Sequence, residues 1–256
     1  MSGMLQPEVL VLGGTGTVGG GVVAALLEAG SRVLAVGRSG ERLKALRRRF
    51  ADAPGLETLV GSVADDQSAE ALAAAIAERE RPLAAVVASL GSPLTSGRLI
   101  DRPASALLRR LQRDLLPHLA AARQLLPLLA DLGGRYVLVG SPCALRPWAG
   151  HGETSVTASA TRMLAQVLHE EAQPLGVRVQ LLSVEQPVCN PARKAEACSE
   201  WFSPLAVGRC AVSLLAGRGQ PGQVIVNADK KFASLPVAGQ LAGVPLPLSL
   251  QEVSSP

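Results

Sequence analysis

The sequence predicts an α/β fold, a doubly wound parallel sheet of about seven strands with helices on both faces. Short, continuously apolar runs recur along the chain, as is typical of strands that are buried on both faces of a parallel sheet. Helical patterns separate these runs, and parallel neighbours need such crossovers. A glycine-rich turn follows the first run and opens the first helix.

The expected strands are apolar runs bounded by turn residues. In chain order they are VLVLGG (9–14), RVLAVG (32–37), LETLVGSV (56–63), LAAVVASLG (83–91), RYVLVGS (135–141), VRVQLLSV (177–184) and QVIVNAD (223–229).

The expected helices lie between these strands, with one running through an unusually long stretch. They cover residues 19–29, 41–50, 69–80, 103–131, 154–173 and 203–216. Gly30 ends the first, because glycine readily adopts the left-handed conformation at a helix C-terminus. Pro117 and Pro127 predict bends or breaks in the fourth, because proline removes a helical hydrogen bond.

The chain is long enough for one large α/β domain or two small ones, and it contains no internal linker or repeat. With 48% hydrophobic residues it can bury a sizeable core. We therefore expect a single domain over residues 1–256. The tail, residues 230–256, is rich in Pro, Leu and Ser, and we expect it to be irregular or to dock on a neighbouring subunit.

Composition narrows the classes of partner. No apolar run reaches the ~18 residues of a membrane span, and the N-terminus lacks the order of a secretory signal, so we expect a cytoplasmic protein without a membrane partner. Aromatic residues make up 2% of the chain, which argues against stacking on single-stranded nucleic acid. The four cysteines show no metal-ligand spacing, so no metal site is expected; they are Cys143, Cys189, Cys198 and Cys210.

The turn GGTGTVG carries glycines three residues apart, at Gly13, Gly16 and Gly19. Glycine permits a tight turn and a close approach of backbone N–H groups to a pyrophosphate, while the helix N-terminus supplies partial positive charge. The alternative is a turn whose glycines serve only helix–sheet packing. The expected cofactor contacts here are Gly13, Thr15, Gly16, Thr17, Val18 and Gly19.

The second strand ends in VGRSGERL, which places Arg38 and Ser39 where a NAD-preferring site has a carboxylate. A guanidinium can bind a 2′-phosphate through paired hydrogen bonds. We therefore expect NADP(H) rather than NAD(H). The alternative is that Arg38 is an ordinary surface residue.

With these motifs the chain resembles the short-chain dehydrogenase/reductase family over roughly residues 7–229. The likeness rests on VLGGTGTVG, VGRSGERL, GGRYVLVGS, PLGVRVQLL and PGQVIVNAD. It implies a Rossmann-like fold and an Asn-Ser-Tyr-Lys tetrad. In that tetrad the Ser polarises a carbonyl, the Tyr transfers the proton, the Lys supports the Tyr and the cofactor ribose, and the Asn holds a water.

Carried onto this chain, the tetrad keeps only its serine, Ser141. The Tyr position falls at Thr154, the Lys position at Ala158 and the Asn position near Asp114. The single tyrosine, Tyr136, lies inside an expected strand.

The resemblance also implies that the family's NNAG segment reads ASLG at 88–91 and that its PG turn reads Val184-Glu185. The family's adenine-contacting Asp becomes Ser62. It thereby assigns cofactor contacts to Ser62, Val63 and Ser89. The adenosine half of the site is largely kept, and the nicotinamide half is mostly rewritten.

Several side chains could replace the missing relay. His151 precedes Thr154 by three residues and could move a proton near neutral pH, with a solvent-exposed loop histidine as the alternative. Asp114 could act as a base, or orient a water or His151, with a polar residue on a helix face as the alternative. It could also pair with His118 one turn later. Glu185 and the Cys143 thiol are further candidates, and the thiol is favoured as structural. The expected catalytic residues are Ser141, His151, Asp114 and Thr154.

Three functions remain open. The first is an NADP(H)-dependent oxidoreductase of a small carbonyl or alcohol with a non-standard proton donor. The second is a relative that uses the pocket for non-redox acid–base chemistry, as a cyclase, isomerase, dehydratase or lyase. The third is a nucleotide sensor or partner protein without catalysis. The resemblance, with the apolar stretch at 104–130, also implies a homodimer or homotetramer.

Overall fold

The computed structural model describes residues 6–79, 81–189, 201–217 and 222–233. Seven strands in these residues form one sheet in the order β3-β2-β1-β4-β5-β6-β7, and every neighbouring pair is parallel. This arrangement confirms the predicted doubly wound α/β fold. The strands are β1 (Glu8–Leu12), β2 (Arg32–Gly37), β3 (Leu56–Val60), β4 (Leu83–Ala88), β5 (Arg135–Val139), β6 (Arg178–Ser183) and β7 (Ile225–Asn227).

The α-helices follow the predicted order, with two differences. They are α1 (Thr17–Glu28), α2 (Gly40–Arg49), α3 (Asp66–Ala77), α4 (Ala104–Asp114), α5 (Leu116–Leu129), α6 (Gly152–Ala172), α7 (Pro204–Leu215) and α8 (Lys230–Ala233). The long helix expected over 103–131 divides at Leu115, because Pro117 belongs to the first turn of α5. Pro127 stays inside the last turns of α5 without ending it. The tail, expected to be irregular, begins with α8, and residues 234–256 lie outside the described part.

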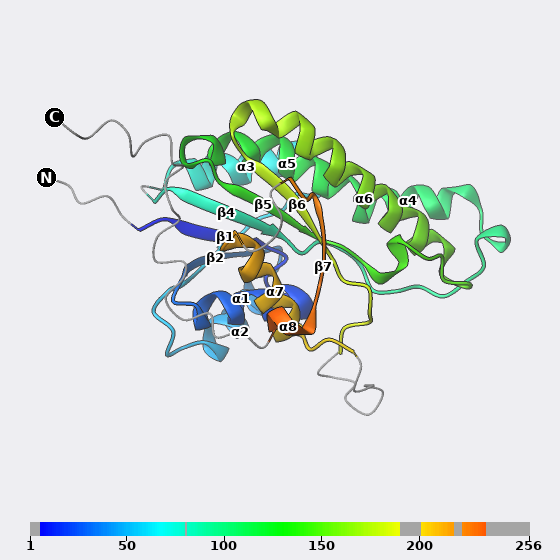
Figure 1. Ribbon diagram of the computed structural model, residues 1–256, viewed down its shortest axis with the longest axis horizontal. Coiled ribbons are helices and arrows are strands. Elements are labelled where there is room, and N and C mark those ends of the chain that lie inside the picture. The colour runs from blue at the N-terminus through cyan, green and yellow to red at the C-terminus, as the bar shows by residue number, and fades with distance from the viewer. Residues whose placement is uncertain (1–5, 80, 190–200, 218–221, 234–256) are drawn as a thin grey trace, which may run out of the picture.

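The helices cover both faces of the sheet (Figure 1). In β1, Leu10 and Leu12 face the core beneath α3, α5 and α6, and Val9 and Val11 face the core beneath α1 and α7. All four side chains are almost fully buried. The continuous apolar run of β1 therefore feeds two hydrophobic cores at once, as expected of a central strand in a parallel sheet.

The strand order reverses between β1 and β4, which are neighbours although two strands intervene in the chain. At such a switch point the loops that follow the two strands separate and leave a crevice at their carboxyl ends. The turn after β1 touches the segment after β4 here, because a Cβ atom on Gly13 would lie 2.2 Å from the Ser89 carbonyl oxygen. The candidate site is built around this point.

Helix α1 packs directly against α7. A Cβ atom on Gly21 would lie 2.0 Å from the Pro204 carbonyl oxygen, and one on Gly208 would lie 2.2 Å from the Gly21 carbonyl oxygen. Such distances leave room for hydrogen only, so the two helix backbones touch directly. This contact fixes α1 against α7 on the same face of the sheet (Figure 1).

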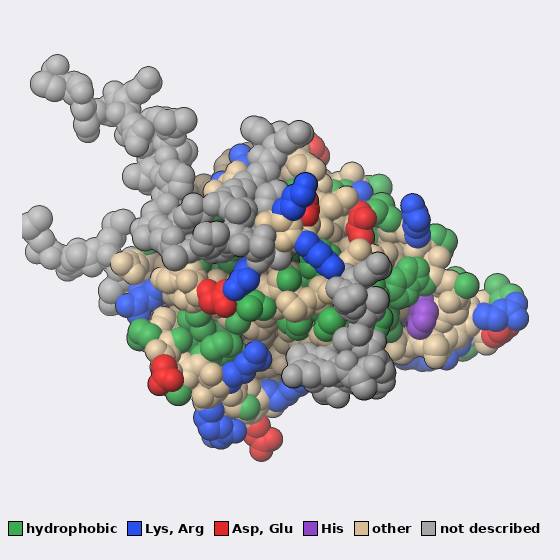
Figure 2. Space-filling model, turned by 60° about the horizontal axis from the view of Figure 1, so that its bottom comes forward, with side chains coloured by type: hydrophobic (Ala, Val, Ile, Leu, Met, Phe, Trp, Pro, Cys, Tyr) green, Lys and Arg blue, Asp and Glu red, His purple; other side chains and the backbone are tan. Residues whose placement is uncertain are grey.

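The charged surface has no dominant patch in the view of Figure 2, where Lys and Arg side chains are interspersed with Asp and Glu. No α-helix among the described residues combines the length and the apolar composition that crossing a bilayer requires. Three of the cysteines are free thiols, at Cys143, Cys189 and Cys210, and Cys198 falls outside the described residues.

Candidate active site at the carboxyl ends of the strands

The glycine turn forms the first part of the site. Gly13 has a φ of +72°, in the left-handed region that favours glycine. Helix α1 begins at Thr17, and no side chain caps it at Gly16. Gly16 and Thr17 are exposed, so the first-turn N–H groups, which lack intrahelical acceptors, face solvent. This end of α1 fits a pyrophosphate, whereas half-buried Val18 packs on the core and can contribute its backbone.

Arg38 is exposed directly after β2. Thr15 approaches Gly37, the last residue of β2, since a Cβ atom on Gly37 would be 3.2 Å from the Thr15 hydroxyl oxygen. The Ser39 hydroxyl accepts a hydrogen bond from the Arg42 backbone N–H at 3.3 Å and thereby caps α2. The exposed Arg38 side chain and the Thr15 side chain therefore both lie near the carboxyl end of β2, and a guanidinium and a hydroxyl both suit a phosphate monoester.

The other expected cofactor residues lie after β3 and β4. The Ser62 hydroxyl accepts the Ala64 N–H at 3.1 Å, and Val63 is buried in the core. The Ser89 N–H donates to the Leu12 carbonyl at 3.1 Å, which holds the segment after β4 against the glycine turn. These side chains mainly shape the edges of the crevice.

A cavity of about 100 Å³ lies beyond this crevice, between the segment after β4, the α4–α5 junction, the end of β5 and the first turns of α6. It is lined by Leu90, Gly91, Ser92, Leu94, Arg110, Asp114, His118, Val139, Gly140, Ser141, Thr154, Thr157, Ala158 and Thr161. Ser141, Asp114 and Thr154 thus share one cavity with Ala158. None of these lining residues is a tyrosine or a lysine.

Tyr136 is enclosed in the core and has no exposed surface. Burial raises the pKa of its hydroxyl, so it stays protonated in the core. The only tyrosine of the chain therefore does not reach the cavity.

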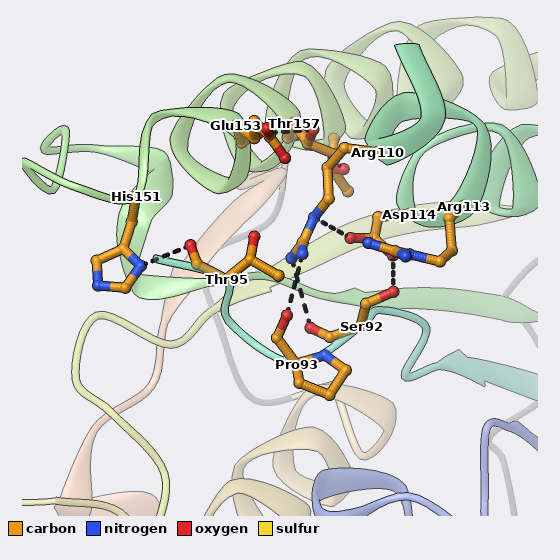
Figure 3. A network of polar contacts seen from close by, with 10 residues as sticks. Ser92, Pro93, Thr95, Arg110, Arg113, Asp114, His151, Glu153 and Thr157 are labelled. Carbon is orange, nitrogen blue, oxygen red and sulfur yellow. Dashed lines mark hydrogen bonds and ion pairs between the residues drawn. The ribbon is translucent and has the colours of Figure 1, made fainter. Parts of the chain in front are cut away.

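Asp114 is held in a buried polar network (Figure 3). Its carboxylate pairs with the Arg110 Nε atom and accepts a hydrogen bond from the Ser92 hydroxyl at 2.5 Å. Arg110 also donates to the Pro93 carbonyl at 3.0 Å and to the Ser92 carbonyl at 3.5 Å. The network ties the segment after β4 to α4. A carboxylate so fully engaged is poorly placed to take a proton from a substrate.

His118 lines the same cavity from α5 and is 1% exposed. Burial lowers its pKa to about 4, although a hydrogen bond to the Leu90 backbone and the Asp114 charge act in the opposite direction. Its Nδ1 atom has no hydrogen-bond partner among the described residues. The ring is therefore uncharged at neutral pH and has a free nitrogen.

Two hydroxyl groups remain for chemistry. Ser141 follows β5 closely, and Thr154 comes from the first turn of α6. The Thr154 hydroxyl oxygen is buried and lacks a partner in the described chain. By contrast, the Thr157 and Thr161 hydroxyls donate to backbone carbonyls one turn earlier, at 2.9 and 3.0 Å. Thr154 is therefore free to bind a ligand.

The Cys143 thiol lies near Ser141 and Ser155, and burial raises its pKa despite their hydrogen bonds. A raised pKa disfavours the reactive thiolate. Glu185 is exposed after β6 and does not line the cavity. Neither side chain has the surroundings of a reactive group.

The structure does not bring His151 to the cavity. Its Nδ1 atom lies 3.0 Å from the Thr95 carbonyl oxygen, and its ring packs edge-on near Trp148. Figure 3 shows the ring turned toward Thr95, away from Arg110 and Asp114. Beside it, the Gly97 N–H donates to the Gly150 carbonyl at 2.6 Å. His151 is the residue before α6, and its contact with the Thr95 carbonyl joins two loops outside the cavity.

Sequence reasoning missed Arg110 and Ser92. The spacing held a signal for the first, because Arg110 precedes Asp114 by four residues and such pairs face one another on a helix. Ser92 had no such signal, because its hydroxyl meets Asp114 only through the path of an irregular segment.

Comparisons with known proteins agree with this geometry. A family model described as short chain dehydrogenase matches residues 7–187. A short-chain oxidoreductase from Pseudomonas aeruginosa PAO1, described as containing an atypical catalytic center, superposes with a TM-score of 0.76 at 24% identity, covering 88% of this chain and 96% of its own. No curated protein sequence matches the chain.

Two further solved structures with a similar fold are described as having a bound cofactor. An NADPH-bound short-chain oxidoreductase from Pseudomonas aeruginosa PAO1 has a TM-score of 0.73 at 24% identity, with 86% of this chain and 95% of that chain covered. ElxO with NADP bound has a TM-score of 0.78 at 16% identity, with 90% and 100% covered. At these identities the likeness establishes the shared fold.

Proposed function

The chain belongs to the short-chain dehydrogenase family, and on this premise we propose that it is an NADP(H)-dependent oxidoreductase. It would reduce small carbonyl compounds, or oxidise the corresponding alcohols, with a proton donor other than the family tyrosine. The family membership is established, and the cofactor, the substrate and the proton donor are our proposal.

The observation that carries the proposal is the pairing of two features at the carboxyl edge of the sheet. The uncapped N-terminus of α1 suits a pyrophosphate, and Arg38 at the end of β2 suits a 2′-phosphate. Ser141 and a cavity lie across the β1–β4 switch point from them. The NADP and NADPH described in structures of the same fold support the same cofactor here.

The cofactor, when bound, supplies a hydride. The Ser141 hydroxyl would donate a hydrogen bond to the carbonyl oxygen, and Thr154 offers a second, unpartnered hydroxyl. A proton from solvent would pass through these hydroxyls to the product oxygen. An alcohol is a weak acid, and general acid–base help is worth ~10²–10⁴-fold, so we expect turnover slower than tyrosine-assisted reduction by about that factor.

The cofactor is tested first. Fluorescence titration with NADPH and NADH should give the tighter dissociation constant for NADPH. Arg38→Asp should weaken NADPH binding roughly tenfold to a hundredfold, because a charge-assisted pair contributes about 1.5–3 kcal/mol. The variant should leave NADH binding unchanged or improved. Equal affinity of the unmodified protein for both cofactors would contradict the proposal.

The reaction is tested by following the reduced-nicotinamide absorbance with a panel of carbonyl compounds. Ser141→Ala should lower kcat at least tenfold. Adding Thr154→Val to this variant should lower kcat further. His151→Gln serves as the matched control, because this side chain lies outside the cavity. Loss of turnover in His151→Gln with unchanged Ser141→Ala would overturn the assignment of the proton path.

A non-redox reaction in the same cavity is the second candidate. It is favoured by one observation, namely that the residues lining the cavity include no tyrosine or lysine. NADPH binding without oxidation by any carbonyl, together with turnover of a substrate without cofactor consumption, would select it. Binding without either reaction would favour a nucleotide sensor.

A further inference from the structure

We propose that the cavity takes an uncharged substrate, and that Asp114 determines this specificity by neutralising the buried guanidinium of Arg110. The inference rests on the proposed oxidoreductase function, and it names the substrate class of the same cavity. Asp114 is a specificity-determining residue in this view and takes no proton.

The charges that line the cavity cancel. The titratable lining residues are Arg110, Asp114 and His118. Arg110 and Asp114 are 3% and 7% exposed and form a direct ion pair. His118 is almost fully buried and lacks a charge at neutral pH. A ligand in this cavity therefore meets no net charge.

Arg110 is also engaged as a hydrogen-bond donor. One Nη atom donates to the Pro93 carbonyl and the other to the Ser92 carbonyl, while the Nε atom pairs with the Asp114 carboxylate as an ion pair and makes no hydrogen bond among the described residues. A carboxylate ligand needs the paired donors of a free guanidinium. It would have to displace Asp114 or these carbonyls, and leaving a buried ionised group unpaired is strongly unfavourable.

The charged side chains just outside the cavity are paired with each other or screened by solvent. Glu153, at the start of α6, pairs with Arg102 at 2.9 Å, and the glutamate side chain is 9% exposed. The exposed Arg113 side chain lies 3.7 Å from Asp114 and is 54% exposed, so solvent screens it. The Arg102–Glu153 pair is therefore balanced, and the additional positive charge of Arg113 lies at the surface, outside the residues that line the cavity.

The uncharged groups suit a small neutral carbonyl or hydroxyl compound. The Thr154 hydroxyl and the His118 Nδ1 atom are buried without partners in the described chain, and both residues line the cavity. Buried polar atoms are nearly always hydrogen-bonded, so unpartnered ones beside a cavity indicate a bound molecule. Leu90, Leu94 and Val139 provide the apolar walls.

The test compares matched neutral and anionic carbonyl compounds of the same skeleton. These are methyl pyruvate and pyruvate, methyl acetoacetate and acetoacetate, and methyl levulinate and levulinate. We measure kcat/KM for NADPH oxidation and, separately, the shift in Tm of the NADPH-loaded protein with each compound. The unmodified protein should prefer the ester by at least tenfold in at least one pair.

Asp114→Asn keeps the shape of the side chain and its ability to accept the Ser92 hydrogen bond, but it removes the charge. It should reduce the ester-to-acid preference at least tenfold, because the buried charge of Arg110 is then uncompensated and favours an anionic ligand. Adding Arg110→Gln should restore the preference for the ester. Arg113→Gln is the control and should leave the ratio unchanged, because this arginine is exposed.

The outcomes separate the two proposals. If no carbonyl compound is reduced, the oxidoreductase function fails, and the Tm shifts still decide the charge preference. An equal response to both members of every pair, absence of any response included, overturns the inference. So does a preference for the acids, or a ratio that Asp114→Asn leaves unchanged while the variant remains folded. The ester-to-acid ratio of the unmodified protein decides the question without any variant.

Discussion

Gly19 lies so close to Gly13 that a Cβ atom built on it would stand 2.1 Å from the Gly13 carbonyl oxygen and 2.8 Å from its carbonyl carbon. The neighbouring Gly20 differs sharply, since its Cβ atom would lie 3.6 Å from the nearest atom, the Gly14 carbonyl oxygen. The third glycine of the turn is therefore required by contact between the first turn of α1 and the end of the loop.

Gly19→Ala should disrupt the glycine turn. The methyl group meets rigid backbone, so α1 or the turn must shift, and we expect NADPH affinity to fall at least tenfold and the Tm to drop. Gly20→Ala is the matched control. It should retain affinity and gain up to ~1 kcal/mol, because glycine inside a helix is less stable than alanine by about that amount. Equal effects of both substitutions would contradict this view of the turn.

Glu8 should make a large contribution to stability. Its carboxylate is 2% exposed and accepts two hydrogen bonds from Arg79, at 3.0 and 2.9 Å, and Arg79 also reaches Glu57 at 2.8 Å. Removing one partner of a buried ion pair destabilises a protein by ~3–5 kcal/mol. Urea unfolding of Arg79→Ala should give a loss toward the lower end of this range, because Arg79 is 24% exposed and Arg81 remains 3.8 Å from the Glu8 carboxylate.

The control for that experiment is the exposed pair of Arg123 and Asp66, at 3.0 Å, whose side chains are 59% and 65% exposed. Arg123→Ala should change the free energy of unfolding by less than ~1 kcal/mol, because solvent screens such pairs. A loss in Arg123→Ala as large as that in Arg79→Ala would show that burial does not govern these pairs.

His118 should make the folded state sensitive to mild acid. Its pKa is about 4 in the folded protein, below the ordinary value of 6.5 that it takes when unfolded. The stability that the protein gains from keeping this histidine uncharged is therefore fully present above pH 6.5. It is lost as the pH falls toward about 4, because the unfolded state binds the proton first. The loss is about 1.4 kcal/mol per pH unit, or roughly 3 kcal/mol in total.

This prediction is measured by urea unfolding across that pH range. His118→Leu should remove most of the slope assigned to the histidine, while His151→Gln should keep it, because His151 lies in an outer loop. An unchanged slope in a folded His118→Leu protein would show that other groups cause the acid sensitivity.

Exposed apolar side chains on the outer faces of three helices lead us to expect that the protein self-associates. Exposed apolar side chains on α4, α5 and α6 include Leu108, Leu116, Leu119, Val156, Met163 and Val167. These helices lie on the same side of the sheet in Figure 1. Exposed apolar side chains gathered on one side of the sheet (Figure 1) are unfavourable in water, so we propose a homodimer or homotetramer.

Light scattering after gel filtration should therefore give at least twice the monomer mass. Met163→Glu combined with Val167→Glu should reduce the mass to that of the monomer. Leu175→Glu is the control, because Leu175 is 38% exposed in the turn after α6 and lies outside this face. A monomeric unmodified protein would contradict the proposal.

The sequence predicted most of the sheet because its evidence is local. Each strand is a short apolar run, and the glycine turn lies between a strand and a helix, so neither depends on distant residues. Asp65 shows the limit of such patterns. It caps α3 by accepting the Ser68 N–H at 2.8 Å, and the helix therefore begins three residues before the apolar pattern that predicted it.

The candidate site was predicted less completely because it depends on irregular segments. Ser141 and Thr154 could be located from their positions after β5 and at the start of α6. The orientation of His151 could not, because the preceding loop turns its side chain toward Thr95. The role of Arg110 depends on carbonyl groups at Ser92 and Pro93, and their position follows from a loop path that no periodicity describes.

The reversal of strand order between β1 and β4 has an evolutionary consequence. Loops after the first three strands hold the groups that suit the nucleotide, while loops and helices after the next two hold the cavity. The two sides meet at the contact between Gly13 and Ser89, and side chains away from that contact can be substituted without moving the other side's backbone. Side chains that line the cavity can therefore change during evolution while the glycine turn and Arg38 keep their positions.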